Sequence, residues 1–91
     1  MTITRNLRIS GQVQGVGFRM YVTRKARELG LAGWVRNRQD GSVEAEIQGT
    51  PAAVDAMVAA ARRGPAGSVV TGVQVTDGSE QYQGFEVRPT E

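Results

Sequence analysis

The order in which hydrophobic periodicity changes along this chain is the strongest constraint on its fold. Apolar residues alternate with polar ones in two segments, as in half-buried strands, and two shorter apolar segments also suggest strands. In two other segments they recur every three or four residues, as in amphipathic helices. The order is strand, helix, strand, strand, helix, strand. The strand-like segments centre on Leu7–Val13, Trp34–Val35, Val43–Ile47 and Val73–Val75, and the helix-like segments cover residues 18–29 and 51–63.

Both predicted helices have terminal residues that agree with their periodicity. Gly30 follows the first helix at the position where chains commonly leave a helix. Thr50 can cap the second helix, and Pro51 suits its first position. Arg62 and Arg63 favour its last turn, because cations interact well with the carboxyl end of the helix dipole. The apolar stripes consist of Phe18, Val22, Ala26 and Leu29 in the first helix and Val54, Met57, Val58 and Ala61 in the second.

The connections complete a fold prediction. Asp40-Gly41 between two extended segments indicates a hairpin, residues 65–72 indicate a surface loop, and Phe85–Val87 indicates a short fifth strand. The order of elements predicts an α+β protein, a ferredoxin-like α/β sandwich of βαββαβ type, with two helices on one face of an antiparallel sheet. A chain of 91 residues has room for one core, so we expect a single domain over residues 1–91.

The composition narrows the chemistry that this chain can perform. It contains no Cys and no His, which excludes thiol nucleophiles, Ser-His-Asp triads and ordinary zinc sites. Ten of its 11 basic residues are Arg, which compositional bias alone can explain. The formal net charge of +2 is too small to indicate nucleic-acid binding by itself. We expect no metal, no cofactor and no nucleic-acid partner.

The sequence also lacks the usual targeting and membrane signals. Its first five residues are polar overall and include no apolar run of the kind found in a signal peptide. No segment approaches the roughly 20 apolar residues that a membrane-spanning helix requires. We therefore expect a cytoplasmic monomer without a membrane partner.

The segment Gly11–Arg19 carries the clearest indication of chemistry. It leaves a strand, passes through a loop with Gly15 and Gly17, and enters a helix whose first N–H groups have no partner within the helix. Such N–H groups bind phosphate, and the guanidinium of Arg19 can add a bidentate contact. The alternative is an ordinary strand-to-helix turn with a solvated Arg, because short glycine patterns are weak motifs. A cation at a helix N-terminus is unfavourable unless an anion binds there, which counts against that alternative.

Asn37, near the end of the second strand, is a second candidate. An Asn at this place commonly serves a turn. It can meet the glycine loop only if the strands bring the two segments together, which spacing alone does not establish. Met20 and Tyr21 follow the loop and could shape a pocket for an acyl group, but we expect helix packing for one and partial exposure for the other.

Two stretches of the chain resemble the signatures of the acylphosphatase family. Residues 11–19, GQVQGVGFR, are similar to the first signature. Residues 33–37, GWVRN, followed by residues 40–44, DGSVE, are similar to the second. The resemblance covers nearly the whole chain, although residues 65–91 match only loosely. Gln12 stands where many members have Lys or Arg; its side chain should point away from the core, so we expect little effect.

The resemblance implies a ferredoxin-like sandwich that hydrolyses acyl phosphates to a carboxylate and inorganic phosphate. By motif position, Arg19 corresponds to the phosphate-binding residue and Asn37 to the residue that orients the attacking water. The phosphate cradle corresponds to the backbone amides of Gly15, Val16, Gly17, Phe18 and Arg19. A carboxylate leaves without a proton, and the substrate phosphate can accept the proton of water, so the missing His and Cys are no obstacle.

Several alternatives remain open at the level of sequence. Asp40, Glu44 and Glu46 are acidic candidates for a general base, but we expect Asp40 to serve the turn and the two glutamates to face solvent. The loop could also belong to a non-catalytic anion-binding module. An RNA-binding module would need aromatic residues on the open sheet face, where only Trp34 is expected near the middle of a strand. Similar domains also occur within larger carbamoyl-transfer maturation proteins, whereas we expect a free-standing enzyme.

Overall fold

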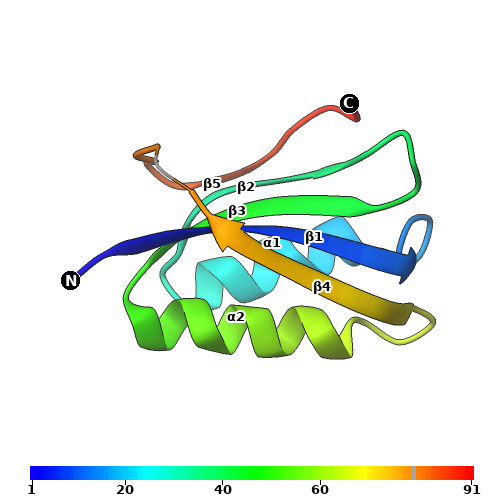
Figure 1. The fold of residues 1–91 in the computed structure, drawn as a ribbon, viewed down its shortest axis with the longest axis horizontal. Helices are drawn as coiled ribbons and strands as arrows, with labels where there is room; N and C mark the ends of the chain where they lie inside the picture. Colours follow the sequence, from blue (N-terminus) through cyan, green and yellow to red (C-terminus); the bar gives the residue numbers. More distant parts are fainter. Residues whose placement is uncertain (79) are drawn as a thin grey trace.

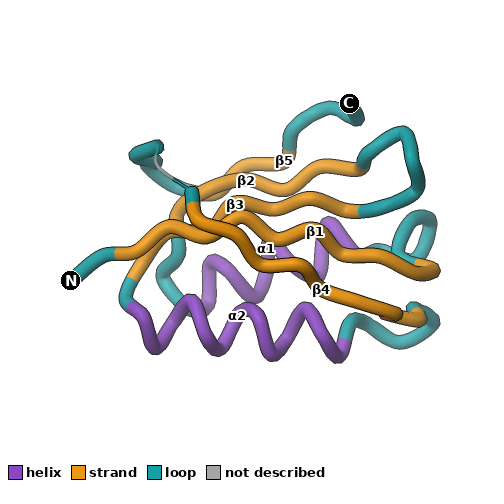
Figure 2. Tube along the Cα trace, viewed as in Figure 1, coloured by secondary structure: helices purple, strands orange, loops and turns teal. Residues whose placement is uncertain are grey.

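The strand and helix segments fold in the predicted order. The computed structural model describes residues 1–78 and 80–91. Both helices lie against the same face of a single sheet, as Figures 1 and 2 show. The elements are β1 (Ile3–Gln12), α1 (Phe18–Glu28), β2 (Ala32–Asn37), β3 (Val43–Gly49), α2 (Pro51–Arg63), β4 (Val69–Asp77) and β5 (Phe85–Val87).

The five strands lie side by side in the order β4-β1-β3-β2-β5. The pairs β1–β3, β1–β4 and β2–β3 are antiparallel, as expected, but β5 lies parallel to β2. The sheet is therefore mixed rather than wholly antiparallel. The fifth strand has this direction because the chain crosses from the β4 edge to the opposite edge before β5 begins.

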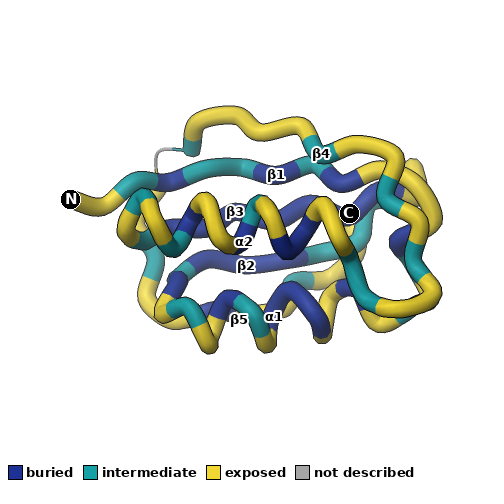
Figure 3. Tube along the Cα trace, turned by 90° about the horizontal axis from the view of Figure 1, so that it is seen from below, coloured by how far each residue is buried: buried dark blue, intermediate teal, exposed yellow. Residues whose placement is uncertain are grey.

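The hydrophobic core follows the two periodicities of the sequence. Apolar side chains of the central strands and the apolar stripes of both helices form one core, and Figure 3 colours the buried residues of these elements dark blue. Burial of one Leu, Ile or Val side chain contributes about 1.5–3 kcal/mol. The fully buried side chains of this core include Leu7, Ile9, Val22, Val35, Ala45, Ile47, Met57 and Ala61.

The helix boundaries agree closely with the sequence signals. Helix α1 ends at Glu28, and Gly30 adopts a φ of 71° two residues later. Helix α2 begins at Pro51 and is capped by Thr50, whose Oγ1 accepts a hydrogen bond from Ala53 N–H at 3.2 Å. No helix in the described part of the chain is long and apolar enough to cross a membrane.

One loop prediction was wrong at its C-terminal end. Residues 65–72 were expected to form a surface loop, but β4 already begins at Val69 and pairs there with Gln12. The strand is longer than its apolar pattern because it forms the outer edge of the sheet, where most of its side chains are exposed (Figure 3). An exposed edge strand needs few apolar residues, so its sequence pattern is weak.

Candidate functional site

The loop between β1 and α1 leaves the N-terminus of α1 open to a ligand. Gly15 and Gly17 have φ angles of 75° and 78°, which lie in the left-handed region that favours glycine. Gly17 is the N-cap of α1, and no side chain there accepts a hydrogen bond from the first helical turn. That turn also contains no acidic residue. Its N–H groups and the positive end of the helix dipole therefore remain available for an anion.

Sheet topology brings Asn37 to this loop. Strand β3 lies between β1 and β2 and is antiparallel to both. The C-terminal ends of β1 and β2 therefore lie next to the same end of β3. Val43 shows this directly, since it pairs with Ile9 of β1 on one side and with Asn37 of β2 on the other. The strands therefore bring Asn37 and the glycine loop together, which sequence spacing alone did not establish.

A small pocket joins the predicted site residues. It has a volume of about 100 Å³, well below the roughly 300–1,000 Å³ of pockets that enclose drug-sized ligands. This size suits a small group such as a phosphoryl group, with the rest of a substrate outside. The pocket is lined by Val13, Gly15, Gly17, Phe18, Arg19, Met20 and Asn37.

Four residues at or beside the pocket differ in how far their side chains are exposed. Arg19 is exposed, and no carboxylate in the described part of the chain forms an ion pair with it. Val16 is not a lining residue, and its side chain packs against the core. Tyr21 is packed, with its hydroxyl donating to Ala60 O at 2.8 Å, whereas Met20 is 70% exposed at the pocket. One packed and one exposed side chain were expected here.

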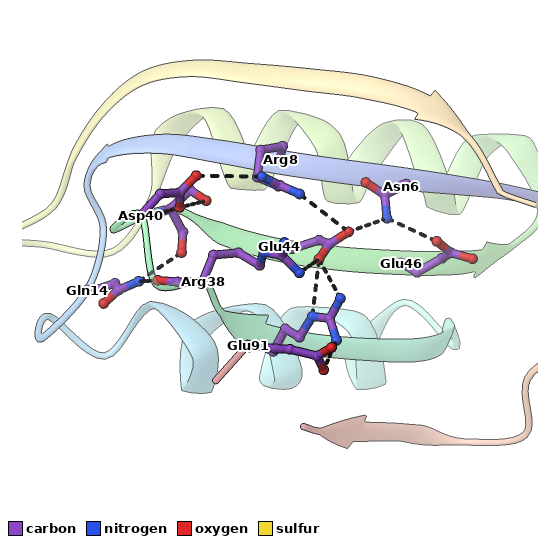
Figure 4. Close-up of polar contacts among 10 residues, drawn as sticks. Asn6, Arg8, Gln14, Arg38, Asp40, Glu44, Glu46 and Glu91 are labelled. Atoms are coloured by element: carbon purple, nitrogen blue, oxygen red, sulfur yellow. Dashed lines mark hydrogen bonds and ion pairs between the residues drawn. The ribbon is translucent and has the colours of Figure 1, made fainter. Parts of the chain in front are cut away.

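The sheet face opposite the helices carries a buried polar network that the sequence did not indicate (Figure 4). Glu44 was expected to face solvent, but it is 8% exposed. Its carboxylate accepts hydrogen bonds from Asn6 at 3.0 Å and from Arg36 at 3.0 and 3.1 Å. Arg38 and Arg8 add ion pairs at 3.3 and 3.8 Å. Burial alone would raise the pKa of Glu44, but the hydrogen bonds from Asn6 and Arg36 and the nearby Arg charges outweigh it and lower that pKa.

The second glutamate on this face is also buried, which corrects the same expectation. Glu46 is 9% exposed and accepts hydrogen bonds from Asn6 at 3.0 Å and from the Tyr82 hydroxyl at 2.7 Å. Burial and the charge and hydrogen bond of Glu46 raise the pKa of Tyr82 to about 12. Tyr82 packs on Glu46, whereas Glu44 is enclosed by Asn6 and by the side chains of Arg8, Arg36 and Arg38.

Trp34 occupies the same polar face and is unsuited to stacking on a nucleic-acid base. It is 5% exposed, and its indole N–H donates to the Tyr82 hydroxyl at 3.1 Å. The guanidinium groups of Arg36 and Arg88 lie over its ring, 4.7 and 4.9 Å from the centroid. The ring is therefore already engaged by cations of the chain itself.

Asp40 serves the turn between β2 and β3, as predicted. Its Oδ1 accepts hydrogen bonds from the Ser42 hydroxyl at 2.6 Å and from Ser42 N–H at 2.9 Å. These two bonds lower the pKa of Asp40. Within residues 1–78 and 80–91 there is no group of three or more acidic side chains arranged to hold a metal ion.

Sequence reasoning assigned no role to Gln14. Its side-chain amide donates hydrogen bonds to the backbone oxygens of Arg38 at 2.7 Å and Ser42 at 2.8 Å. These contacts connect the glycine loop to the turn that follows Asn37. No sequence signal marks such a contact, because any residue can supply a backbone carbonyl.

Comparison with known proteins places this chain in a family. The family model described as Acylphosphatase matches residues 5–87. An acylphosphatase from Thiobacillus denitrificans is 52% identical over 85 residues, which cover 93% of this chain and 96% of the relative.

Solved structures give the same result. An acylphosphatase from Bacillus subtilis matches with a TM-score of 0.90 and 37% identity, covering 97% of this chain and 99% of that one. A full-length HypF, in a phosphate- and nucleotide-bound form, matches with a TM-score of 0.91 and 29% identity. The match covers 99% of this chain and 12% of HypF, so the fold also occurs within a much larger protein.

Proposed function

The chain belongs to the acylphosphatase family and hydrolyses acyl phosphates, and we propose that Arg19 and the N-terminus of α1 bind the phosphoryl group while Asn37 orients the attacking water. The observation that carries this proposal is the convergence of three features at one pocket. These features are a guanidinium without an ion-pair partner among the described residues, a helix N-terminus without a side-chain cap, and a side-chain amide from another strand. The first two suit an anion, and the third can both accept and donate a hydrogen bond to water.

The phosphoryl group is held by charge and by backbone amides. The N–H groups of residues 15–19 surround its non-bridging oxygens, and Arg19 supplies a bidentate cation from the first turn of α1. These donors are fixed by the glycine loop before the substrate arrives. Donors that need no reorganisation stabilise the developing charge of a transition state more effectively than water does.

Hydrolysis proceeds by attack of water on phosphorus. Asn37 holds the water in line with the acyl oxygen, a new P–O bond forms, and the P–O bond to the acyl group breaks. The carboxylate departs with the bonding electron pair and needs no general acid. The proton of the water is transferred to a phosphoryl oxygen, so the products are a carboxylate and inorganic phosphate.

The acidic residues near the site are committed to other contacts. Asp40 binds Ser42, and Glu44 is held by Asn6 and by three Arg side chains. Both groups have lowered pKa values, which makes them weaker bases. A mechanism that uses the substrate's own phosphate as proton acceptor is consistent with this arrangement.

We further propose that the protein acts as a cytoplasmic monomer on a small acyl phosphate, without nucleic acid, and that residues 1–91 form one domain. Size-exclusion chromatography with light scattering tests the monomer, and a gel-shift assay with single-stranded RNA tests the absence of nucleic-acid binding.

A turnover assay with a simple acyl phosphate tests the assigned roles. Asn37→Ala should lower kcat by about 10²-fold or more, because water is no longer positioned, and should leave the inhibition constant of inorganic phosphate nearly unchanged. Gln39→Ala is a matched control, since Gln39 is exposed two residues further on. Loss of phosphate affinity with an unchanged kcat in Asn37→Ala would show that the assignment is wrong.

A further inference from the structure

We propose that Gln14 is a positioning residue, which fixes Asn37 relative to the phosphate-binding loop. This inference rests on the roles proposed above for the loop and for Asn37. Gln14 lies between Val13 and Gly15, which both line the pocket, but is not a lining residue itself. Its side chain points toward the turn after β2 (Figure 4).

The contacts of Gln14 use its full donor capacity. Its Nε2 carries two hydrogens, which it donates to Arg38 O at 2.7 Å and to Ser42 O at 2.8 Å. The Gln14 side chain is half-buried, which protects these bonds from competition with water. Among the described residues, no other side-chain hydrogen bond joins residues 13–17 to residues 37–42.

The turn already satisfies both carbonyls through its own backbone. Arg38 N–H donates to Ser42 O at 2.8 Å, and Gly41 N–H donates to Arg38 O at 3.1 Å. Gln14 is therefore not needed to satisfy these buried acceptors. Its two additional bonds connect the closed turn to the loop.

Asn37 directly precedes this turn and is the last residue of β2. The connection through Gln14 therefore sets the distance between the water-orienting amide and the bound phosphoryl group. A displacement of about 1 Å in a reacting geometry can cost about 10²-fold in rate. Within the described chain no hydrogen bond joins Gln14 to Arg19 or to the first turn of α1, so phosphate binding should survive its loss.

The test is Gln14→Met, which keeps the length of the side chain and removes both donors. We expect kcat to fall about 10–100-fold while the inhibition constant of inorganic phosphate changes by less than about threefold. Gln12→Met is the matched control; Gln12 is exposed two residues earlier, has no side-chain hydrogen bond within the described chain, and its replacement should change neither constant. An unchanged kcat in Gln14→Met overturns the proposal.

A double-mutant cycle separates positioning from simple support of the fold. If Gln14 acts through Asn37, adding Gln14→Met to Asn37→Ala should lower kcat by less than about twofold. An equal loss in both backgrounds overturns the proposal. Gln14→Glu, which keeps the shape and removes the donors at neutral pH, replaces Gln14→Met if that variant does not fold. Asn37→Ala with the kcat of the unmodified protein refutes the proposed role of Asn37, whereas failure of Gln14→Met alone refutes only the role of Gln14.

Discussion

The two helices of this protein begin in opposite ways. Helix α2 is capped from within, because Thr50 accepts a hydrogen bond from Ala53 and Pro51 occupies the first position. Helix α1 begins at a left-handed glycine without a side-chain cap and carries Arg19 in its first turn. In the first arrangement the side chain of Thr50 engages one N–H of the first turn, and Pro51 has no N–H to engage. The second leaves N–H groups and a cation unsatisfied, and this difference separates a structural helix end from a binding one.

The largest effect should come from removing the cation at the open end. Arg19→Ala should reduce turnover of a small acyl phosphate about 10²–10³-fold, because charge developing in the transition state loses its fixed partner. Far-ultraviolet circular dichroism should remain unchanged, since Arg19 is exposed and makes no ion pair in the described chain. Arg24→Ala, which changes an exposed Arg on the same helix, is the control. Near-normal turnover by Arg19→Ala would remove the functional distinction between the two helix ends.

Inorganic phosphate should stabilise the protein through the open helix end. At a concentration 100-fold above its dissociation constant, a ligand that binds only the folded state adds about 2.7 kcal/mol to the free energy of unfolding. Thermal unfolding in sodium phosphate, compared with sodium chloride at equal ionic strength, measures this increase. The increase should be present in Thr50→Ala and lost in Arg19→Ala. An equal increase in both variants would mean that phosphate binds elsewhere.

The backbone at the open end can be tested with Gly17→Ala. The φ of 78° at Gly17 is unfavourable for Ala, while the new methyl group would meet no atom within 4 Å. The free energy of unfolding should therefore fall by about 1–2 kcal/mol from backbone strain alone. Gly72→Ala is the control, because Gly72 has no positive φ and also has open space around it. Equal stability of the two variants in urea unfolding would contradict the strained cap.

The smallest effect should come from the closed end. Thr50→Ala removes the cap of α2 and should lower the free energy of unfolding by about 1 kcal/mol. Because α2 contributes no residue to the pocket, kcat and KM should stay unchanged. A changed kcat in a folded Thr50→Ala protein would show that the two helix ends are coupled.

The features that the sequence could reveal are local ones. The bounds of both helices follow from apolar spacing together with Thr50, Pro51 and Gly30, all of which act within a turn or two. The loop of Gly15 and Gly17 was identifiable for the same reason.

Features that depend on distant segments were missed. The burial of Glu46 depends on Tyr82, and that of Glu44 depends on side chains from β1 and from the end of β2, all of which reach it only in the folded sheet. In the sequence, both glutamates alternate with apolar residues in the same way as glutamates on the solvent-facing side of a strand. The parallel pairing of β5 with β2 also depends on a crossing connection that has no periodic signal.

The position of β3 between β1 and β2 has a consequence for the protein during its synthesis. All residues that line the pocket lie between Val13 and Asn37, yet β3, which holds the two ends of the site together, is made afterwards. A nascent chain that has just exposed Asn37 outside the ribosome would possess every pocket residue and no pocket. The pocket that joins the glycine loop to Asn37 therefore forms only after β3 inserts, through long-range pairing rather than through local structure.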